Sequence, residues 1–364
     1  GRVFKPYIIK KMGDYRIGII GQAFPYVPIA HPKRFTPDWT FGIRDDEMQK
    51  VVNRLRNDEK VDAVVLLSHN GMDVDLKLAS RVSGIDVILG GHTHDAVPQP
   101  ISIANAGGKT LVTNAGSNGK YLGVLDLELG KGSVKNVNYR LLPVFTNELK
   151  ADAEMAALVE KLRAPHAKML DEKVGNADRL LYRRGNFNGT MDEMICDALR
   201  QQLDAEIALS PGFRWGTTVL SGQAITMGDI MSQTAITYPE VYVQPMTGEQ
   251  IKAILEDICD NLFNLDPYYQ QGGDMVRTGG MSYRCAPNES SGNRISEMKF
   301  DGAALDPAKS YKVAGWASLN EQKGAPVWET VASYLRDGKA KSKSTGSQVT
   351  ITGVDDNPGY AGHA

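Results

Sequence analysis

Two short apolar runs, each of which stops at a histidine, constrain the fold of this chain more than any other feature. Residues 64–68 read Val-Val-Leu-Leu-Ser and lead into His69, and residues 85–89 lead through a Gly-Gly pair into His92 and His94. Apolar runs of this length predict strands that are buried on both faces of a parallel sheet. Each histidine is then expected at the edge where open α/β sheets place their chemistry.

The segment between the two runs predicts how the strands are connected. Apolar residues recur at three-residue intervals within residues 74–83, which indicates a helix. A strand, a crossover helix and a second strand form a β-α-β unit with parallel strands. The sequence therefore predicts an α/β fold that brings His69 close to His92 and His94.

Three imidazoles beside small residues suit a borderline metal such as zinc, manganese or iron. The preceding Gly90-Gly91 pair allows a tight turn with the backbone close to a ligand. The alternative is three polar histidines that cap strand ends at the surface. Two strand-end motifs joined by one crossover favour the metal site.

The composition limits the classes of function. The chain has 364 residues, enough for two domains with real cores, and is 42% apolar and 23% charged, as in ordinary globular proteins. A net charge of −2 gives no electrostatic footprint for nucleic acid. No apolar run approaches a membrane span, and the first four residues are not a signal peptide. The three cysteines, Cys196, Cys259 and Cys285, are interpreted as buried free thiols rather than as a nucleophile or metal site.

Periodicity and turn residues predict the remaining elements. The first half is expected to contain a long aromatic loop that packs over a site, between a hairpin and a helix. The second half is expected to begin after a helical linker broken at Pro165, and to contain two capping boxes, at Thr190 and Thr247, that open helices. The expected ranges are strands 7–9, 15–21, 110–114, 121–129, 206–209, 235–243, 295–300 and 311–315, loop 22–44, and helices 45–57, 190–202 and 247–262.

Two arginines lie in glycine-containing loops of the second half. Arg214 follows Ser-Pro-Gly-Phe, and Arg277 ends the stretch Tyr-Tyr-Gln-Gln-Gly-Gly-Asp-Met-Val-Arg. An arginine in such a loop suits an oxyanion such as phosphate or sulfonate. The alternative for each is a solvated arginine on a surface loop.

The residues around the histidines resemble a known family. Residues 68–71 and 90–94 are similar to the last two metal-binding motifs of the calcineurin-like metallophosphoesterases, in the 5′-nucleotidase branch. The second half resembles the C-terminal substrate domain of that branch. More narrowly, the chain looks like the thiosulfohydrolases of bacterial sulfur oxidation, in residues 20–26, 69–75, 181–189, 210–216 and 268–277.

This resemblance implies a fold and a domain organisation. Residues 1–145 would form part of a metallophosphoesterase αββα sandwich, and residues 146–172 a helical linker. Residues 173–364 would form an α+β C-terminal domain of the 5′-nucleotidase type.

The resemblance also implies a site and a reaction. Two manganese ions would form a dinuclear centre, with His69 and His92 on one ion and His94 on the other. The substrate would be a cysteine S-thiosulfonate on a carrier protein of the sulfur-oxidation (Sox) system, from which sulfate is released in the periplasm. Arg214 matches a substrate-binding arginine of the nucleotidases, and Arg277 is a second candidate.

One departure from the family leads to a further expectation. The family also uses an Asp-x-His motif, a bridging Asp and a Gly-Asn-His motif, and the sequence contains neither Asp-x-His nor Gly-Asn-His. Three neutral imidazoles without a bridging carboxylate cannot hold two dications close together. We therefore interpret the chain as a fragment that alone binds metal weakly and does not turn over.

Two other functions remain open from the sequence. A nucleotidase would stack its base between aromatic residues, and Tyr238 and Trp316 fall near the corresponding positions. A non-catalytic module that only binds the carrier is the second alternative.

Overall fold

The computed structural model describes residues 4–183, 185–213, 216–320, 322–338 and 348–354. The chain forms two compact units. The first contains Gly1–Ala151 together with Leu265–Gly272, and the second contains Asp152–Asn264 and Gly273–Ala364. A short segment from the second half of the sequence therefore belongs to the first unit.

The first unit is built on a six-stranded sheet with the order β1-β2-β3-β4-β6-β5. The four central strands are parallel, and the edge strands β1 and β5 are antiparallel to their neighbours. A separate hairpin, β7–β8, completes the unit. Its elements are β1 (Tyr7–Met12), β2 (Tyr15–Gln22), α1 (Val27–Ala30), η1 (Lys33–Phe35), α2 (Asp45–Asn57), β3 (Ala63–Ser68), α3 (Met72–Arg81), β4 (Val87–Gly90), β5 (Ile101–Asn105), β6 (Gly108–Asn114), β7 (Tyr121–Gly130), β8 (Ser133–Pro143) and η3 (Pro267–Tyr269).

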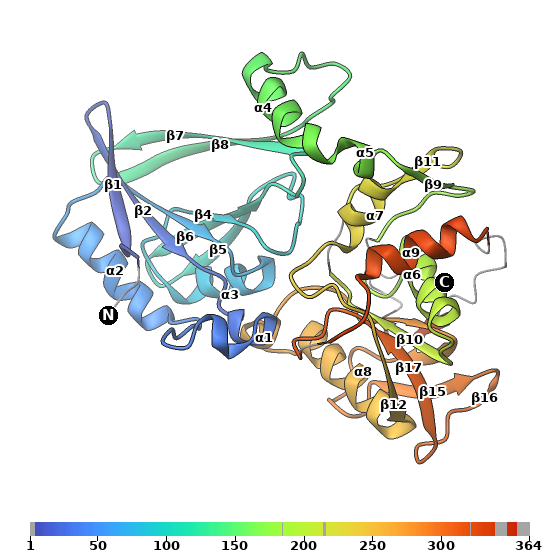
Figure 1. Ribbon diagram of the computed structural model, residues 1–364. Coiled ribbons are helices and arrows are strands. Elements are labelled where there is room, and N and C mark those ends of the chain that lie inside the picture. Colours follow the sequence, from blue (N-terminus) through green and yellow to red (C-terminus); the bar gives the residue numbers. More distant parts are fainter. Residues whose placement is uncertain (1–3, 184, 214–215, 321, 339–347, 355–364) are drawn as a thin grey trace. The chain divides into compact units, whose positions relative to one another are not determined.

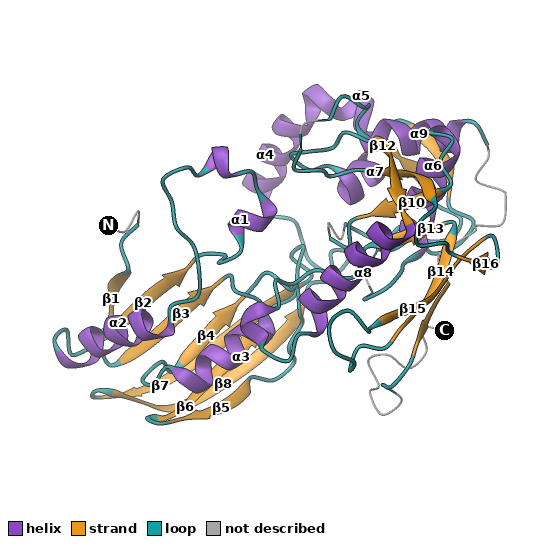
Figure 2. Cartoon of the chain, turned by 90° about the horizontal axis from the view of Figure 1, so that it is seen from below, coloured by secondary structure: helices purple, strands orange, loops and turns teal. Residues whose placement is uncertain are grey.

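Helices α2 and α3 lie against one face of this sheet (Figures 1 and 2). Their apolar stripes pack with the strand residues that point to that face, among them Val64, Leu66 and Ile88. On the other face of β3, Ala63 is buried but Leu67 is 49% exposed. The prediction that the strands are buried on both faces therefore fails at the carboxyl end of β3, whereas β4 buries both Val87 and Ile88.

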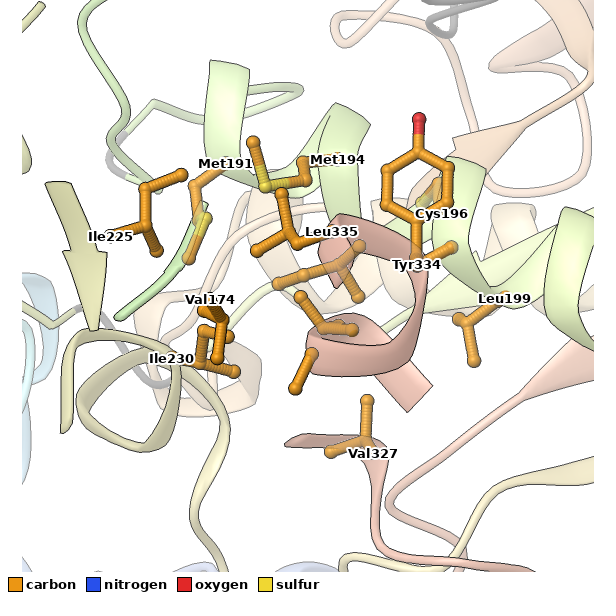
Figure 3. Packing of buried hydrophobic residues seen from close by; sticks show 14 of the residues in the cluster. Val174, Met191, Met194, Cys196, Leu199, Ile225, Ile230, Val327, Tyr334 and Leu335 are labelled. Atoms are coloured by element: carbon orange, nitrogen blue, oxygen red, sulfur yellow. The ribbon is translucent and has the colours of Figure 1, made fainter. Parts of the chain in front are cut away.

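The second unit mixes helices with two four-stranded sheets, β12-β17-β10-β13 and β16-β15-β14-β18, and a two-stranded sheet, β9–β11. Side chains from α6, α7 and α9 form one of its cores (Figure 3). Its elements are α4 (Ala153–Arg163), η2 (Ala164–His166), α5 (Ala167–Leu170), β9 (Lys173–Asn176), α6 (Thr190–Gln202), β10 (Ile207–Ser210), β11 (Ala224–Thr226), α7 (Met227–Thr234), β12 (Tyr242–Thr247), α8 (Gly248–Phe263), β13 (Arg277–Gly279), β14 (Met281–Cys285), β15 (Ile295–Phe300), β16 (Ala303–Ala304), β17 (Ser310–Gly315), α9 (Val327–Arg336) and β18 (Gln348–Ile351).

The α/β fold class is confirmed, and some local predictions are corrected. The capping box at Thr247 is present, but α6 begins after Gly189 without one, because the Thr190 hydroxyl hydrogen-bonds the Leu180 carbonyl instead. The strand predicted over residues 235–243 is wrong. A capping box at Thr226 starts α7, which runs to Thr234, and β12 begins only at Tyr242.

The cysteines are buried, as predicted, at 0–2% exposure, and the Cys259 and Cys285 sulfurs are 3.5 Å apart. No helix in the described ranges combines the length and apolar character that a bilayer crossing demands.

The alternation along β3 gives a stability test with an internal control. Leu66 is fully buried, whereas its neighbour Leu67 is largely exposed. We expect Leu66→Ala to lower the free energy of unfolding by about 2–5 kcal/mol, because it removes apolar contacts and leaves a cavity. Leu67→Ala should cost less than about 1 kcal/mol. Urea unfolding of both variants checks this, and equal losses would contradict the assigned strand faces.

Candidate functional site

The candidate site lies at the carboxyl edge of the six-stranded sheet, in the first unit. His69 follows the last residue of β3, and His92 follows β4 after Gly91. Strands β3 and β4 are parallel neighbours, paired Leu66 to Ile88. Both histidines therefore lie at one edge, and their ring centroids are 5.3 Å apart.

An aromatic side chain from a third strand end joins the two histidines. Phe24 follows β2, which pairs in parallel with β3. Its ring centroid lies 4.2 Å from that of His92 and 6.1 Å from that of His69. Phe24 lies in the loop that the sequence analysis expected to pack over a site. The contact gives the imidazoles an apolar wall.

The backbone at His92 and His94 adopts an uncommon conformation. His92 and His94 both have positive φ angles, of 75° and 60°. A positive φ angle in a residue other than glycine costs about 1–3 kcal/mol and persists only where the surrounding structure holds it. Thr93 provides such a restraint, since its hydroxyl accepts from the Met72 amide at 3.2 Å and donates to the Asp95 carboxylate at 2.5 Å.

The electrostatic surroundings of His92 favour its neutral form. Burial lowers the pKa of His92, and the neighbouring His69 and His94 lower it further. The Gln271 carbonyl, which accepts a hydrogen bond from the ring at 3.0 Å, opposes this shift. A neutral imidazole has one nitrogen lone pair that can bind a metal or accept a proton.

The described residues do not by themselves form a complete metal site. Within those ranges there is no group of three or more His, Cys, Asp or Glu side chains close enough to hold an ion. His69 and His92 are adjacent, and His94 acts on His92 electrostatically. The site as described therefore offers imidazoles but lacks a carboxylate that would complete a coordination shell.

A buried carboxylate of α3, Asp75, supports the ends of strands β3 and β4. Asp75 on α3 is fully buried and accepts hydrogen bonds from the Ser68 hydroxyl at 2.6 Å and the Asn70 amide at 3.0 Å. These two residues flank His69. A Cβ placed on Gly90 would lie 2.9 Å from the other Asp75 oxygen, so a glycine is needed there. Asp75 thus contacts both strand ends that carry histidines.

The segment Leu265–Gly272, which we call the docked segment, also reaches this edge. Besides the contact between Gln271 and His92, Lys77 of α3 forms an ion pair with Asp266 at 2.5 Å. The Tyr26 hydroxyl donates to the Tyr268 carbonyl at 2.8 Å. Residues from the second half of the sequence therefore line the histidine edge.

The arginine predicted to bind substrate from a loop, Arg277, lies in the interior of the second unit. It is 1% exposed. Its guanidinium lies 3.3 Å from Asp192 and 3.1 Å from Asp274, and it donates to the Gly185 carbonyl at 2.6 Å. Arg183 binds the same Asp192 at 2.7 Å. Arg277 is therefore held in a buried ionic cluster, and Arg214 lies outside the described residues.

The aromatic residues considered for a nucleotidase platform differ in accessibility. Trp316 is 2% exposed, and its indole nitrogen donates to the Ser210 hydroxyl at 2.8 Å. Tyr238 is half-buried. A buried indole cannot stack on a ligand in this conformation.

Sequence reasoning missed several residues of the site. Asp75 carried a signal, because it is a charged residue on an otherwise apolar face of a predicted helix. Lys77 and Tyr268 carried none, because their contact joins positions far apart in the sequence. The Gln-Gly-Gly stretch at 271–273 stands out in the sequence only as part of the glycine-containing stretch before Arg277, and nothing in it indicates a contact with His92.

The chain as a whole is similar to known hydrolases. The profile of the 5′-nucleotidase C-terminal domain matches residues 173–329. A structure of the sulfate thiohydrolase SoxB from Thermus thermophilus is 36% identical, with a TM-score of 0.89, over 96% of this chain and 66% of that chain. A structure of a 5′-nucleotidase precursor from the same organism is 22% identical, with a TM-score of 0.77, over 95% and 74% of the two chains.

Similarity extends to a curated sequence as well. The trifunctional nucleotide phosphoesterase YfkN of Bacillus subtilis is 29% identical over 73% of this chain and 19% of its own length. The chain thus spans 66% of the SoxB chain and about a fifth of YfkN.

The buried Asp75 predicts a pH dependence of stability. Burial raises its pKa from 3.8 to about 6. The folded state therefore holds a proton that the unfolded state releases, so this stabilisation is present below pH 4 and is lost as the pH rises through 6. Asp75→Asn keeps an oxygen acceptor but removes the charge. It should reduce the stability change between pH 4 and 6 by roughly 2 kcal/mol. Urea titrations at several pH values check this, with Asp46→Asn at an exposed position of α2 as control. A pH dependence of the unfolding free energy that is the same in Asp75→Asn as in the wild type would contradict it.

The buried ionic cluster predicts that Arg277 contributes to stability. Arg277→Met should lower the free energy of unfolding by about 3–5 kcal/mol, because Asp192 and Asp274 each lose one ionic partner in the interior of the unit. The control is Arg284→Met. Arg284 lies on β14 and forms an exposed ion pair with Glu297 of β15, so its replacement should cost less than about 1 kcal/mol. Calorimetry without any ligand measures both. A negligible effect of Arg277→Met would indicate a binding role instead.

Proposed function

Because this chain belongs to the 5′-nucleotidase family, we propose that it is part of a SoxB-type sulfohydrolase. The reaction is hydrolysis of a cysteine S-thiosulfonate on a Sox carrier protein. Water attacks the terminal sulfone sulfur, and the bond between that sulfur and the neighbouring sulfane sulfur breaks. Sulfate and a proton are released, and the sulfane sulfur stays on the carrier cysteine as a persulfide. The observation that carries this proposal is the similarity to SoxB, at 36% identity and a TM-score of 0.89 over nearly the whole chain.

The side chains of the histidine edge suit a hydrolase of this class. Burial lowers the pKa of His92 and so favours its neutral form, and the ring faces that of His69 across the edge. The Phe24 ring shields one side of His92 from water. A neutral imidazole can accept a proton or bind a metal, and hydrolases use histidine in both ways.

The resemblance implies two manganese ions as cofactors. Of the residues in this chain, His69, His92 and His94 would supply imidazole ligands. The described residues do not complete such a centre. We propose that the carboxylate ligands come from the third of a SoxB-length protein that this chain does not cover. The ions would supply Lewis-acid stabilisation of charge on the transferred group.

Arg214 is the proposed sulfonate-binding residue, because a guanidinium pairs well with oxyanions. Arg277 is proposed to act indirectly, by holding the loop around Gly185 and Asp274 through its buried contacts. The proposed location is the periplasm, where carriers of this type act.

A 5′-nucleotidase is the second candidate function. It is supported by the C-terminal domain that residues 173–329 match. The burial of Trp316 argues against an exposed base-stacking platform at that position. A module that only binds the carrier would retain the second unit without any hydrolysis.

Sulfate release from a thiosulfonated carrier peptide tests this proposal, measured on the full-length protein that contains this chain, with and without added manganese. We expect metal-dependent release that falls at least ~100-fold in His92→Ala, because a ligand matters more than its supporting contacts. His166→Ala, at an exposed histidine of η2, should leave the rate unchanged. The 364-residue chain alone should show no turnover.

The other outcomes of this assay decide between the candidates. Hydrolysis of nucleotide monophosphates without sulfate release would replace the sulfohydrolase by a nucleotidase. Binding of the carrier peptide without either activity would favour the non-catalytic module.

A further inference from the structure

The docked segment contacts the rest of the first unit at Asp266, Tyr268, Gln271 and Gly272. At its start, the Lys77 ammonium lies 2.5 Å from the Asp266 carboxylate and 4.1 Å from the centre of the Tyr268 ring. The Lys77 side chain is 24% exposed and the Asp266 side chain 42%, so water reaches the pair mainly from the carboxylate side. One cation thus anchors two residues of the segment.

A second anchor lies beside the histidine edge. The hydroxyl of Tyr26, which follows β2 and Phe24, donates to the Tyr268 carbonyl at 2.8 Å. Burial raises the pKa of Tyr26 to about 12, so the hydroxyl keeps its proton at neutral pH and remains a donor. The loop after β2 therefore contacts His92 through Phe24 and the docked segment through Tyr26.

The end of the segment touches His92 directly. Nε2 of His92 lies 3.0 Å from the Gln271 carbonyl oxygen. A carbonyl oxygen can only accept, so Nε2 must carry the proton in this contact. A neutral imidazole has one proton on its ring nitrogens, so Nδ1 then holds the lone pair.

The next residue, Gly272, lies so close to the His92 ring that no side chain fits between them. Gly272 has a φ of +80°, and a Cβ built on it would lie 2.7 Å from Nε2 of His92. A side chain at this position would push the backbone away from the imidazole. Gly273 has a similar φ of +89°, but its Cβ would meet nothing closer than 3.5 Å.

We infer that the docked segment is a positioning element for His92, which holds its ring in the tautomer with the proton on Nε2 and leaves the lone pair on Nδ1. The segment does this through the Gln271 carbonyl, and Lys77 and Tyr26 keep that carbonyl in place. The importance of this tautomer for catalysis rests on the proposed function, whereas the tautomer itself is a property of the protein without substrate.

Nitrogen-15 NMR of the histidine-labelled 364-residue chain tests this inference without substrate or metal. The chain has six histidines, and the His92 signal is assigned by its absence in His92→Gln. We expect a slowly exchanging Nε2 proton in the wild type. In Gly272→Ala the ratio of the two tautomers should shift by roughly threefold to tenfold, as expected for loss of one hydrogen bond, and the proton should exchange faster.

Gly273→Ala is the matched control, because it imposes the same backbone strain without reaching the imidazole. It should leave the His92 signals as in the wild type. A second variant guards against a folding defect in Gly272→Ala. Lys77→Met keeps the aliphatic stem but removes the anchor, and it should shift the tautomer ratio in the same direction. Lys50→Met, in the exposed pair with Glu47 on α2, is its control and should have no effect.

Each result has a defined meaning. Unchanged His92 signals in both Gly272→Ala and Lys77→Met would overturn the inference. Equal shifts in Gly272→Ala and Gly273→Ala would also overturn it, since backbone strain alone would then explain them. A confirmed tautomer in a full-length protein that releases no sulfate would leave the positioning role standing and reject only the proposed function.

Discussion

The candidate site depends on the parallel hydrogen bonding of β3 to β4. This pairing sets Leu66 opposite Ile88 and so brings the residues that follow each strand to one edge of the sheet. A slip by one residue would turn every side chain of a strand to the other face. The apolar stripes of α2 and α3, packed on Val64, Leu66 and Ile88, fix the register that places His69 beside His92.

The parts that followed from the sequence are those governed by local pattern and by the crossover rule. The two His-terminated runs and the helix between them identify a β-α-β unit, and the structure places the His69 and His92 rings 5.3 Å apart. Helix α2 has the predicted bounds because its apolar stripe and acidic first turn agree. The predicted burial on both faces failed at Leu67, because a run of Val and Leu does not reveal how far along the strand a second layer covers it.

Contacts between distant positions were not predictable from the sequence. Nothing near Lys77 indicates that it anchors Asp266, and nothing near Gln271 indicates that its carbonyl reaches His92. Arg277 shows the same limit in another form. An arginine in a glycine-containing stretch looks like an anion-binding group, yet Asp192 and Asp274 already occupy its guanidinium. Asp274 lies only three residues before Arg277, but only the fold brings Asp192 to the same guanidinium.

The two units divide the proposed work between them. The first unit supplies the imidazoles, the supporting Asp75 and the docked segment. The second unit contains most of residues 173–329, which match the 5′-nucleotidase C-terminal domain. The most direct test of the central claim is anomalous diffraction from manganese in crystals of the full-length protein. The account predicts manganese at the edge bounded by the imidazoles of His69, His92 and His94. Manganese bound elsewhere, or no bound manganese, would contradict it.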